Sequence, residues 1–146
     1  MLITYLDTSA LIKRYVREPG SEALNAIWPS FSLIGSAVIV HVEVAAALAK
    51  AERLGWLDPE GAQRAWQAFL IDWGKLTLVN VGLHVVQRAS TLAWEHGLRG
   101  YDAVHLAAAL IWQEGIGEPV QLITFDHQLW NSARQLKMTV WPDQLS

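Results

Sequence analysis

Residues Leu2 to Arg17, LITYLDTSALIKRYVR, contain the transition that decides the fold. Leu2 to Leu6 is a short apolar run of residues that favour strands. From Ser9 to Arg17 the apolar side chains instead recur at helical spacing. The stretch therefore predicts a strand, a polar junction at Asp7 and a helix, which is the repeating unit of an α/β protein.

The same alternation continues along the rest of the chain. Strands are predicted at 31–37, 75–81, 119–125 and 138–141, and helices at 21–28, 39–54, 59–73, 83–96, 101–113 and 126–136. Gly55 and Gly97 mark helix ends, and Asp58-Pro59 marks a helix start. Strands that alternate with helices indicate an α/β fold with a parallel sheet. Because the 146 residues contain no linker, repeat or low-complexity tract, we expect one domain spanning 1–146.

Composition excludes several classes of protein. The chain is 52% hydrophobic and only 17% charged, unlike a disordered protein, and its net charge of −3 gives no support for nucleic-acid binding. The absence of cysteine excludes disulfides, thiolate zinc sites and a cysteine nucleophile. The first residues lack a signal-peptide pattern, and Pro29 and Gly35 interrupt the longest uncharged stretch. We therefore expect a cytoplasmic protein that does not enter the membrane.

Four acidic residues stand where an α/β sheet gathers functional groups. Asp7 and Asp126 follow the first and fourth predicted strands, although an aspartate there is also a favoured helix N-cap. Glu43 has only apolar neighbours three and four residues away, which fits either a salt bridge or the edge of a pocket. Asp102 opens an alanine-rich helix, where N-capping or an ion pair with Arg99 is the simpler explanation.

If these carboxylates converge, they require neutralisation. Two unit charges about 4 Å apart repel by roughly 4 kcal/mol at an effective dielectric near 20, so the cluster needs protons or a metal ion. Oxygen ligands without cysteine favour Mg²⁺ or Mn²⁺ over zinc. Such an ion activates a water and neutralises charge on a reacting phosphate. If Asp7, Glu43, Asp102 and Asp126 meet in this way, phosphodiester hydrolysis is the natural reaction, with the four acids as catalytic residues and metal ligands.

Other sources of chemistry find less support. His41-Val42-Glu43 resembles half of a zinc deaminase signature, but the cysteine half cannot exist in this chain. His105 lies one helical turn beyond Asp102 and is interpreted as a hydrogen-bonded packing residue. Trp66 and Trp73 recur at helical spacing with other apolar residues, which favours a packed face over a base-stacking platform.

Taken together, the ordered motifs resemble a known family. YLDTSAL at 5–11, Glu43 within an alanine-rich helix, LRGYDAVHLA at 98–107 and TFD at 124–126 look like the PIN domain. Within that family they resemble the VapC-type ribonuclease toxins of toxin-antitoxin modules. The resemblance covers about residues 3 to 140 and implies a Rossmann-like three-layer α/β/α architecture with a mainly parallel sheet of four to five strands.

The resemblance also implies an activity and partners. These relatives are endoribonucleases that depend on Mg²⁺ or Mn²⁺, act on RNA, usually form homodimers and are held inactive by a cognate VapB-like antitoxin. The positions that match the family's acidic quartet are Asp7, Glu43, Asp102 and Asp126. Ser9 and Thr124 match its hydroxyl positions and are expected to orient carboxylates or water. Arg99 is a candidate phosphate contact.

A second class of function stays open. A catalytically silent PIN-like module would use the same acidic pocket to bind a basic segment of a partner, because an arginine neutralises carboxylates much as a metal ion does. Turnover by purified, partner-free protein with magnesium discriminates the two. A phosphatase with Asp7 as nucleophile is disfavoured, because Asp7-Thr8-Ser9 lacks the second aspartate typical of haloacid-dehalogenase-like enzymes.

Overall fold

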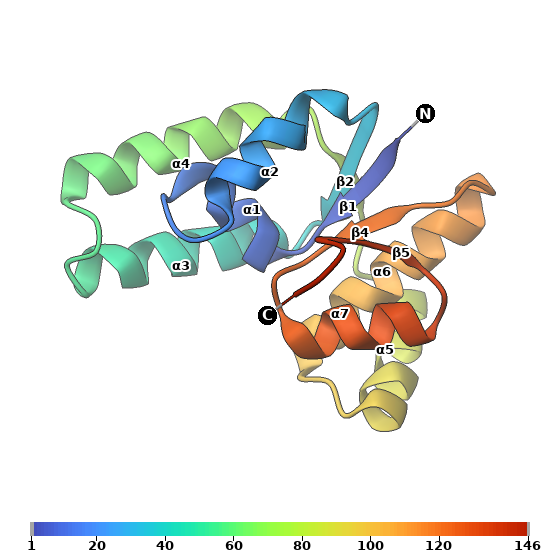
Figure 1. The fold of residues 1–146 in the computed structure, drawn as a ribbon. Coiled ribbons are helices and arrows are strands. Elements are labelled where there is room, and N and C mark those ends of the chain that lie inside the picture. Colours follow the sequence, from blue (N-terminus) through green and yellow to red (C-terminus); the bar gives the residue numbers. More distant parts are fainter. Residues whose placement is uncertain (1, 146) are drawn as a thin grey trace.

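A computed structural model describes residues 2–145 of the chain. Within these residues every pair of neighbouring strands in the sheet is parallel. Its strand order is β3-β2-β1-β4-β5 (Figure 1). The strands are β1 Ile3–Leu6, β2 Leu33–Ala37, β3 Thr77–Val79, β4 Gln121–Ile123 and β5 Thr139–Trp141. All five fall within runs that the sequence predicts as strands.

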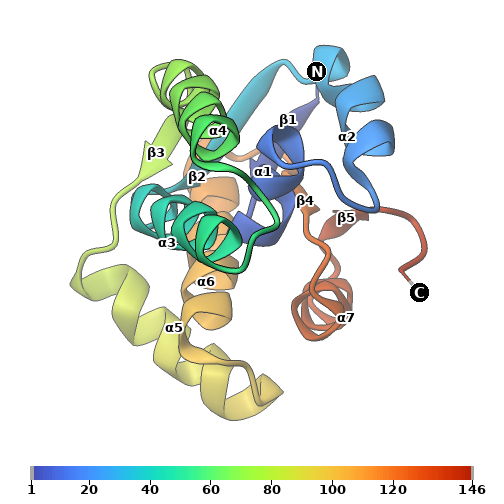
Figure 2. The ribbon, with the colours of Figure 1, turned by 90° about the vertical axis from the view of Figure 1, so that its left-hand side faces the viewer.

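Helices cover both faces of the sheet and make it the middle of three layers (Figures 1 and 2). They are α1 Thr8–Tyr15, α2 Ser21–Ile27, α3 Val40–Arg53, α4 Pro59–Trp73, α5 Leu83–His96, α6 Gly100–Ile116 and α7 His127–Gln135, with a short 3-10 helix at Trp28–Ser30. Helices α1 to α4 pack on one face and α5 to α7 on the other. The predicted three-layer α/β/α fold with a parallel sheet is confirmed.

Alternation along β1 divides the core into two clusters. Ile3 and Tyr5 face α5, α6 and α7, whereas Leu6 faces α1 to α4. The α6 helix packs closely on the sheet, and the ring of Trp112 lies directly over Gly35 of β2. A Cβ at Gly35 would lie 2.6 Å from atoms of that ring, so only glycine admits this approach.

Element bounds differ from the predicted ones at a few ends. Helix α6 begins at Gly100 and continues to Ile116, beyond the predicted 101–113, and it stops where Gly117 adopts a left-handed conformation with φ +68°. Strand β3 is shorter than the predicted 75–81, because the backbone of Lys75 still hydrogen-bonds to the end of α4. No helix within residues 2–145 is long and apolar enough to cross a membrane.

The topology brings the predicted site residues to one edge of the sheet. Strands β1 and β4 are neighbours, and Leu6 pairs with Ile123, so the residues that follow each strand lie side by side. Helix α3 carries Glu43 in its first turn, and α6 carries Asp102 in its first turn. The carboxyl ends of parallel strands therefore gather the predicted acids, as the fold class requires.

Candidate active site

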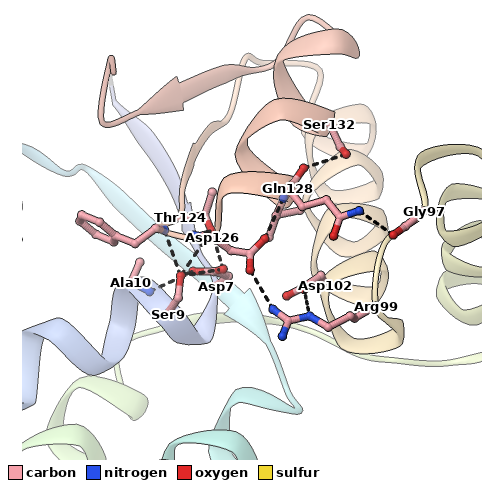
Figure 3. A network of polar contacts seen from close by, with 12 residues as sticks. Asp7, Ser9, Ala10, Gly97, Arg99, Asp102, Thr124, Asp126, Gln128 and Ser132 are labelled. Atoms are coloured by element: carbon pink, nitrogen blue, oxygen red, sulfur yellow. Dashed lines mark hydrogen bonds and ion pairs between the residues drawn. The ribbon is translucent and has the colours of Figure 1, made fainter. Parts of the chain in front are cut away.

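Asp7 follows β1 and is 2% exposed. It is the N-cap of α1: the Ala10 N–H donates to Oδ1 at 2.9 Å. The Ser9 hydroxyl donates to both carboxylate oxygens, and the Thr124 hydroxyl donates to Oδ2 at 2.6 Å (Figure 3). Burial raises the pKa of Asp7 above its usual value, while these donors and nearby His105 act in the opposite direction. Ser9 and Thr124 thus contact the carboxylate that they are predicted to orient.

Asp126 repeats this arrangement at the end of β4. It is the N-cap of α7 and accepts the Leu129 N–H at Oδ1, 2.9 Å away. Its own N–H donates to the Thr124 hydroxyl at 3.1 Å, so one hydroxyl joins the two acids. Oδ2 accepts a hydrogen bond from Arg99 at 2.8 Å (Figure 3).

Arg99 connects Asp126 to Asp102. Its Nε donates to Asp102 Oδ2 at 3.1 Å, and a terminal nitrogen reaches Asp126. Burial raises the pKa of Asp102, the negative charge of Asp126 raises it further, and Arg99 counteracts both. The ion pair considered for Asp102 is therefore present. Asp102 is not the N-cap of α6, because that position belongs to Arg99, whose side chain makes no capping hydrogen bond. In this arrangement the guanidinium pairs with two acids, which is a different contact from the predicted one with phosphate.

Glu43 is held by partners that the sequence reading did not assign to it. Its Oε1 accepts the Thr8 hydroxyl at 2.7 Å and contacts His105 Nε2 at 2.7 Å. On the other side of the ring, His105 Nδ1 lies 2.8 Å from the Tyr5 hydroxyl. Partial burial would raise the pKa of Glu43, but the hydrogen bonds and charge of His105, with Thr8, lower it overall.

His105 is 1% exposed and hydrogen-bonded, as predicted for a packing histidine. The sequence reading missed its partner, and it also missed Tyr5 and Thr8. Their spacing in the sequence could have identified these residues. Tyr5 and Thr8 lie within two positions of Asp7, and His105 follows Asp102 by one helical turn.

A cavity of about 650 Å³ adjoins these groups between α5 and α6. Its lining includes Glu43, Asp102 and Arg99 beside apolar residues of α5 such as Ala89 and Ala93. Asp7 and Asp126 are not part of the lining and instead meet at Thr124. Hydrogen bonds through Thr124 and Arg99 thus link Asp7, Asp126 and Asp102, whereas Glu43 belongs to a separate group with Thr8 and His105. Glu43 and Asp102 line the cavity.

The donor set fits a hard divalent cation. It consists of carboxylate oxygens, and the guanidinium between Asp102 and Asp126 marks a position where positive charge is already stabilised. Within residues 2–145, no three acidic or histidine side chains stand close enough to enclose an ion as they are placed. Mg²⁺ does not require such a cage, because it usually binds through one or two carboxylates and keeps several waters.

Comparisons with known proteins identify the family and the fold. The family model described as "PIN domain" matches residues 4–134. Ribonuclease VapC45 of Mycobacterium tuberculosis (strain CDC 1551 / Oshkosh) is 36% identical over 99% of this chain and 99% of its own length. The crystal structure of PAE2754 from Pyrobaculum aerophilum covers 95% of this chain and 83% of that chain, with a TM-score of 0.65 and 20% identity. VapBC-5 from Mycobacterium tuberculosis, a member of the VapBC family of toxin-antitoxin systems, covers 96% of both chains with a TM-score of 0.60 and 17% identity.

Proposed function

The chain belongs to the PIN domain family, and from this premise we propose that it is a metal-dependent endoribonuclease, the toxin of a toxin-antitoxin module. The observation that carries the proposal is the linked set of acids at the carboxyl edge of the sheet, already paired with a cation from the chain itself. Acids that favour a bound cation suit a phosphodiester substrate better than an uncharged substrate, because the cation can pair with the negatively charged phosphate.

Asp7, Glu43, Asp102 and Asp126 would supply the ligands of one or two Mg²⁺ or Mn²⁺ ions, with one or two carboxylates bound to each ion and waters in its other positions. Such an ion lowers the pKa of a water and neutralises charge that develops on the phosphate. Ser9 and Thr124 keep the Asp7 carboxylate in one orientation through their hydroxyl donors. The Arg99 side chain is 75% exposed at the cavity rim, within reach of solvent and of an RNA phosphate that replaces its carboxylate partners.

The Asp7→Asn substitution tests the proposal, with Asp58→Asn as the matched control. Both aspartates are helix N-caps, and asparagine caps a helix about as well. Because an amide nitrogen cannot accept the bonds that Ser9 and Thr124 donate to Asp7, folding of both variants is checked by circular dichroism. Purified wild-type protein and the Asp58→Asn variant should cleave RNA when magnesium is added, and the Asp7→Asn variant should not. Full cleavage by a folded Asp7→Asn variant would refute the assignment of the site.

We also propose partners for the protein. A VapB-like antitoxin would hold the enzyme inactive, and a second copy of the chain would form a homodimer. One observation favours a second function, that of a silent module that binds a basic segment: the acids accept a guanidinium in this structure. RNA turnover by partner-free protein excludes that alternative, and tight binding of an arginine-rich segment without turnover supports it.

A further inference from the structure

Glu43 is held through only one of its two carboxylate oxygens in the contacts that define its position. Thr8 and His105 both bond to Oε1, and neither of these bonds uses Oε2. The Glu43 side chain is 22% exposed and contributes to the wall of the cavity between α5 and α6. Both bonds thus end on one oxygen of a carboxylate that reaches the cavity wall.

The hydrogen bonds of His105 determine where its proton lies. A carboxylate oxygen accepts hydrogen bonds and does not donate them, so the His105 nitrogen that contacts Glu43, Nε2, must carry the proton. On the other side of the ring, Nδ1 lies 2.8 Å from the Tyr5 hydroxyl, so the imidazole is held between two polar partners. Tyr5 is fully buried and its ring meets the imidazole edge-on at 5.9 Å, which fixes the hydroxyl toward Nδ1.

This chain of contacts spans both sides of the site. It begins at Tyr5 of β1, crosses the ring of His105 in α6 and ends at Glu43 in α3. A leucine at position 105 would fill the same buried space without polar groups that need partners. Burying this polar network costs free energy of desolvation, and the network ends at one carboxylate oxygen. Orientation of that carboxylate therefore explains it better than packing alone.

We propose that His105, held in place by Tyr5, is a positioning residue that donates from Nε2 to Oε1 of Glu43 and leaves Oε2 for the divalent cation. The inference rests on the proposed function, because it assumes that Glu43 is a ligand of that cation. Partners of this kind orient metal ligands in many proteins, and their loss typically weakens metal affinity by about 10- to 100-fold.

The first test locates the Nε2 proton in the wild-type protein. Nitrogen-15 NMR of the histidine rings, with His105 assigned by its loss in the His105→Gln variant, should show a proton on Nε2. In the Tyr5→Phe variant, which keeps the buried ring, this proton should exchange faster with water, because the imidazole loses the partner on its other side. An Nε2 without a proton in the wild-type protein overturns the inference.

The second test measures Mn²⁺ affinity by electron paramagnetic resonance, without RNA. The His105→Leu variant should bind Mn²⁺ about 10- to 100-fold more weakly, whereas His105→Gln, which retains an N–H donor, should recover most of the affinity. Leu110→Ala removes a buried side chain from the same helix and should leave the affinity unchanged.

The outcomes separate the two proposals. Equal Mn²⁺ affinity of folded His105→Leu and wild-type protein overturns the positioning role alone. Mn²⁺ binding by the wild-type protein without RNA cleavage contradicts the proposed function alone, and failure of the wild-type protein to bind Mn²⁺ overturns both.

Discussion

Replacement of Thr124 by valine should destabilise the protein more than its small change in shape suggests. The Thr124 side chain is fully buried, its hydroxyl donates to Asp7 Oδ2 at 2.6 Å, and it accepts the Asp126 N–H at 3.1 Å. A hydrogen bond to a charged group contributes about 1.5–3 kcal/mol, and an ordinary one about 0.5–1.5 kcal/mol. The free energy of unfolding should therefore fall by about 3 kcal/mol, or roughly 6–12 °C in Tm for a chain of this size.

Urea unfolding followed by tryptophan fluorescence, with a chelator present to remove bound metal, measures this loss. Thr124→Ser keeps the hydroxyl and should cost only about 1 kcal/mol for the missing methyl group. Ser36→Ala is the matched control, because Ser36 is equally buried but donates to the neutral carbonyl of Leu6. If Thr124→Val costs no more than Ser36→Ala, the hydroxyl does not stabilise the carboxylates as its geometry indicates.

Three further predictions follow from other contacts. Gly35→Ala should cost about 1–3 kcal/mol in urea unfolding, because the new methyl group collides with the Trp112 ring; an unchanged midpoint would show that the ring moves freely. Arg99→Ala should bind Mn²⁺ more tightly than wild-type protein in calorimetry, because the ion no longer competes with the guanidinium; weaker binding would mean that Arg99 helps to build the site. The affinity for RNA should depend weakly on salt, because Lys13, Arg14 and Arg88 are paired with acids of the chain. A plot of the logarithm of the binding constant against the logarithm of the salt concentration should have a slope shallower than about −3, the value for roughly four phosphate contacts. A steep slope would indicate a broad basic surface.

The elements of this fold are predictable because their sequence signals are local. Asp58-Pro59 starts α4, and Gly97 and Gly117 end α5 and α6 in left-handed conformations. The order of strands in the sheet depends on contacts between distant segments. The pairing of β1 with both β2 and β4, which places Asp7 beside Thr124, follows from no local pattern and required the structure.

The site was predictable in its residues and less so in its partners. Glu43 stands out because its helical neighbours are apolar. Its partner His105, however, lies 62 positions away in another helix. Arg99 shows the same limit. An ion pair with Asp102 is expected from a spacing of three residues, whereas its second bond, to Asp126, depends on the approach of α6 and α7.

The structural and the functional explanations of these acids are compatible, because a carboxylate has two oxygens. In Asp126, Oδ1 caps a helix and Oδ2 binds the guanidinium of Arg99. In Glu43, Oε1 is bound by Thr8 and His105, and Oε2 takes no part in those bonds. An N-cap at a strand end thus fixes an aspartate in space through Oδ1. Local helix capping therefore orients Asp7 and Asp126 as a by-product of folding, whereas Glu43 is oriented by Thr8 and His105. A metal site on these acids requires that a cation replace or join the donors that they now accept.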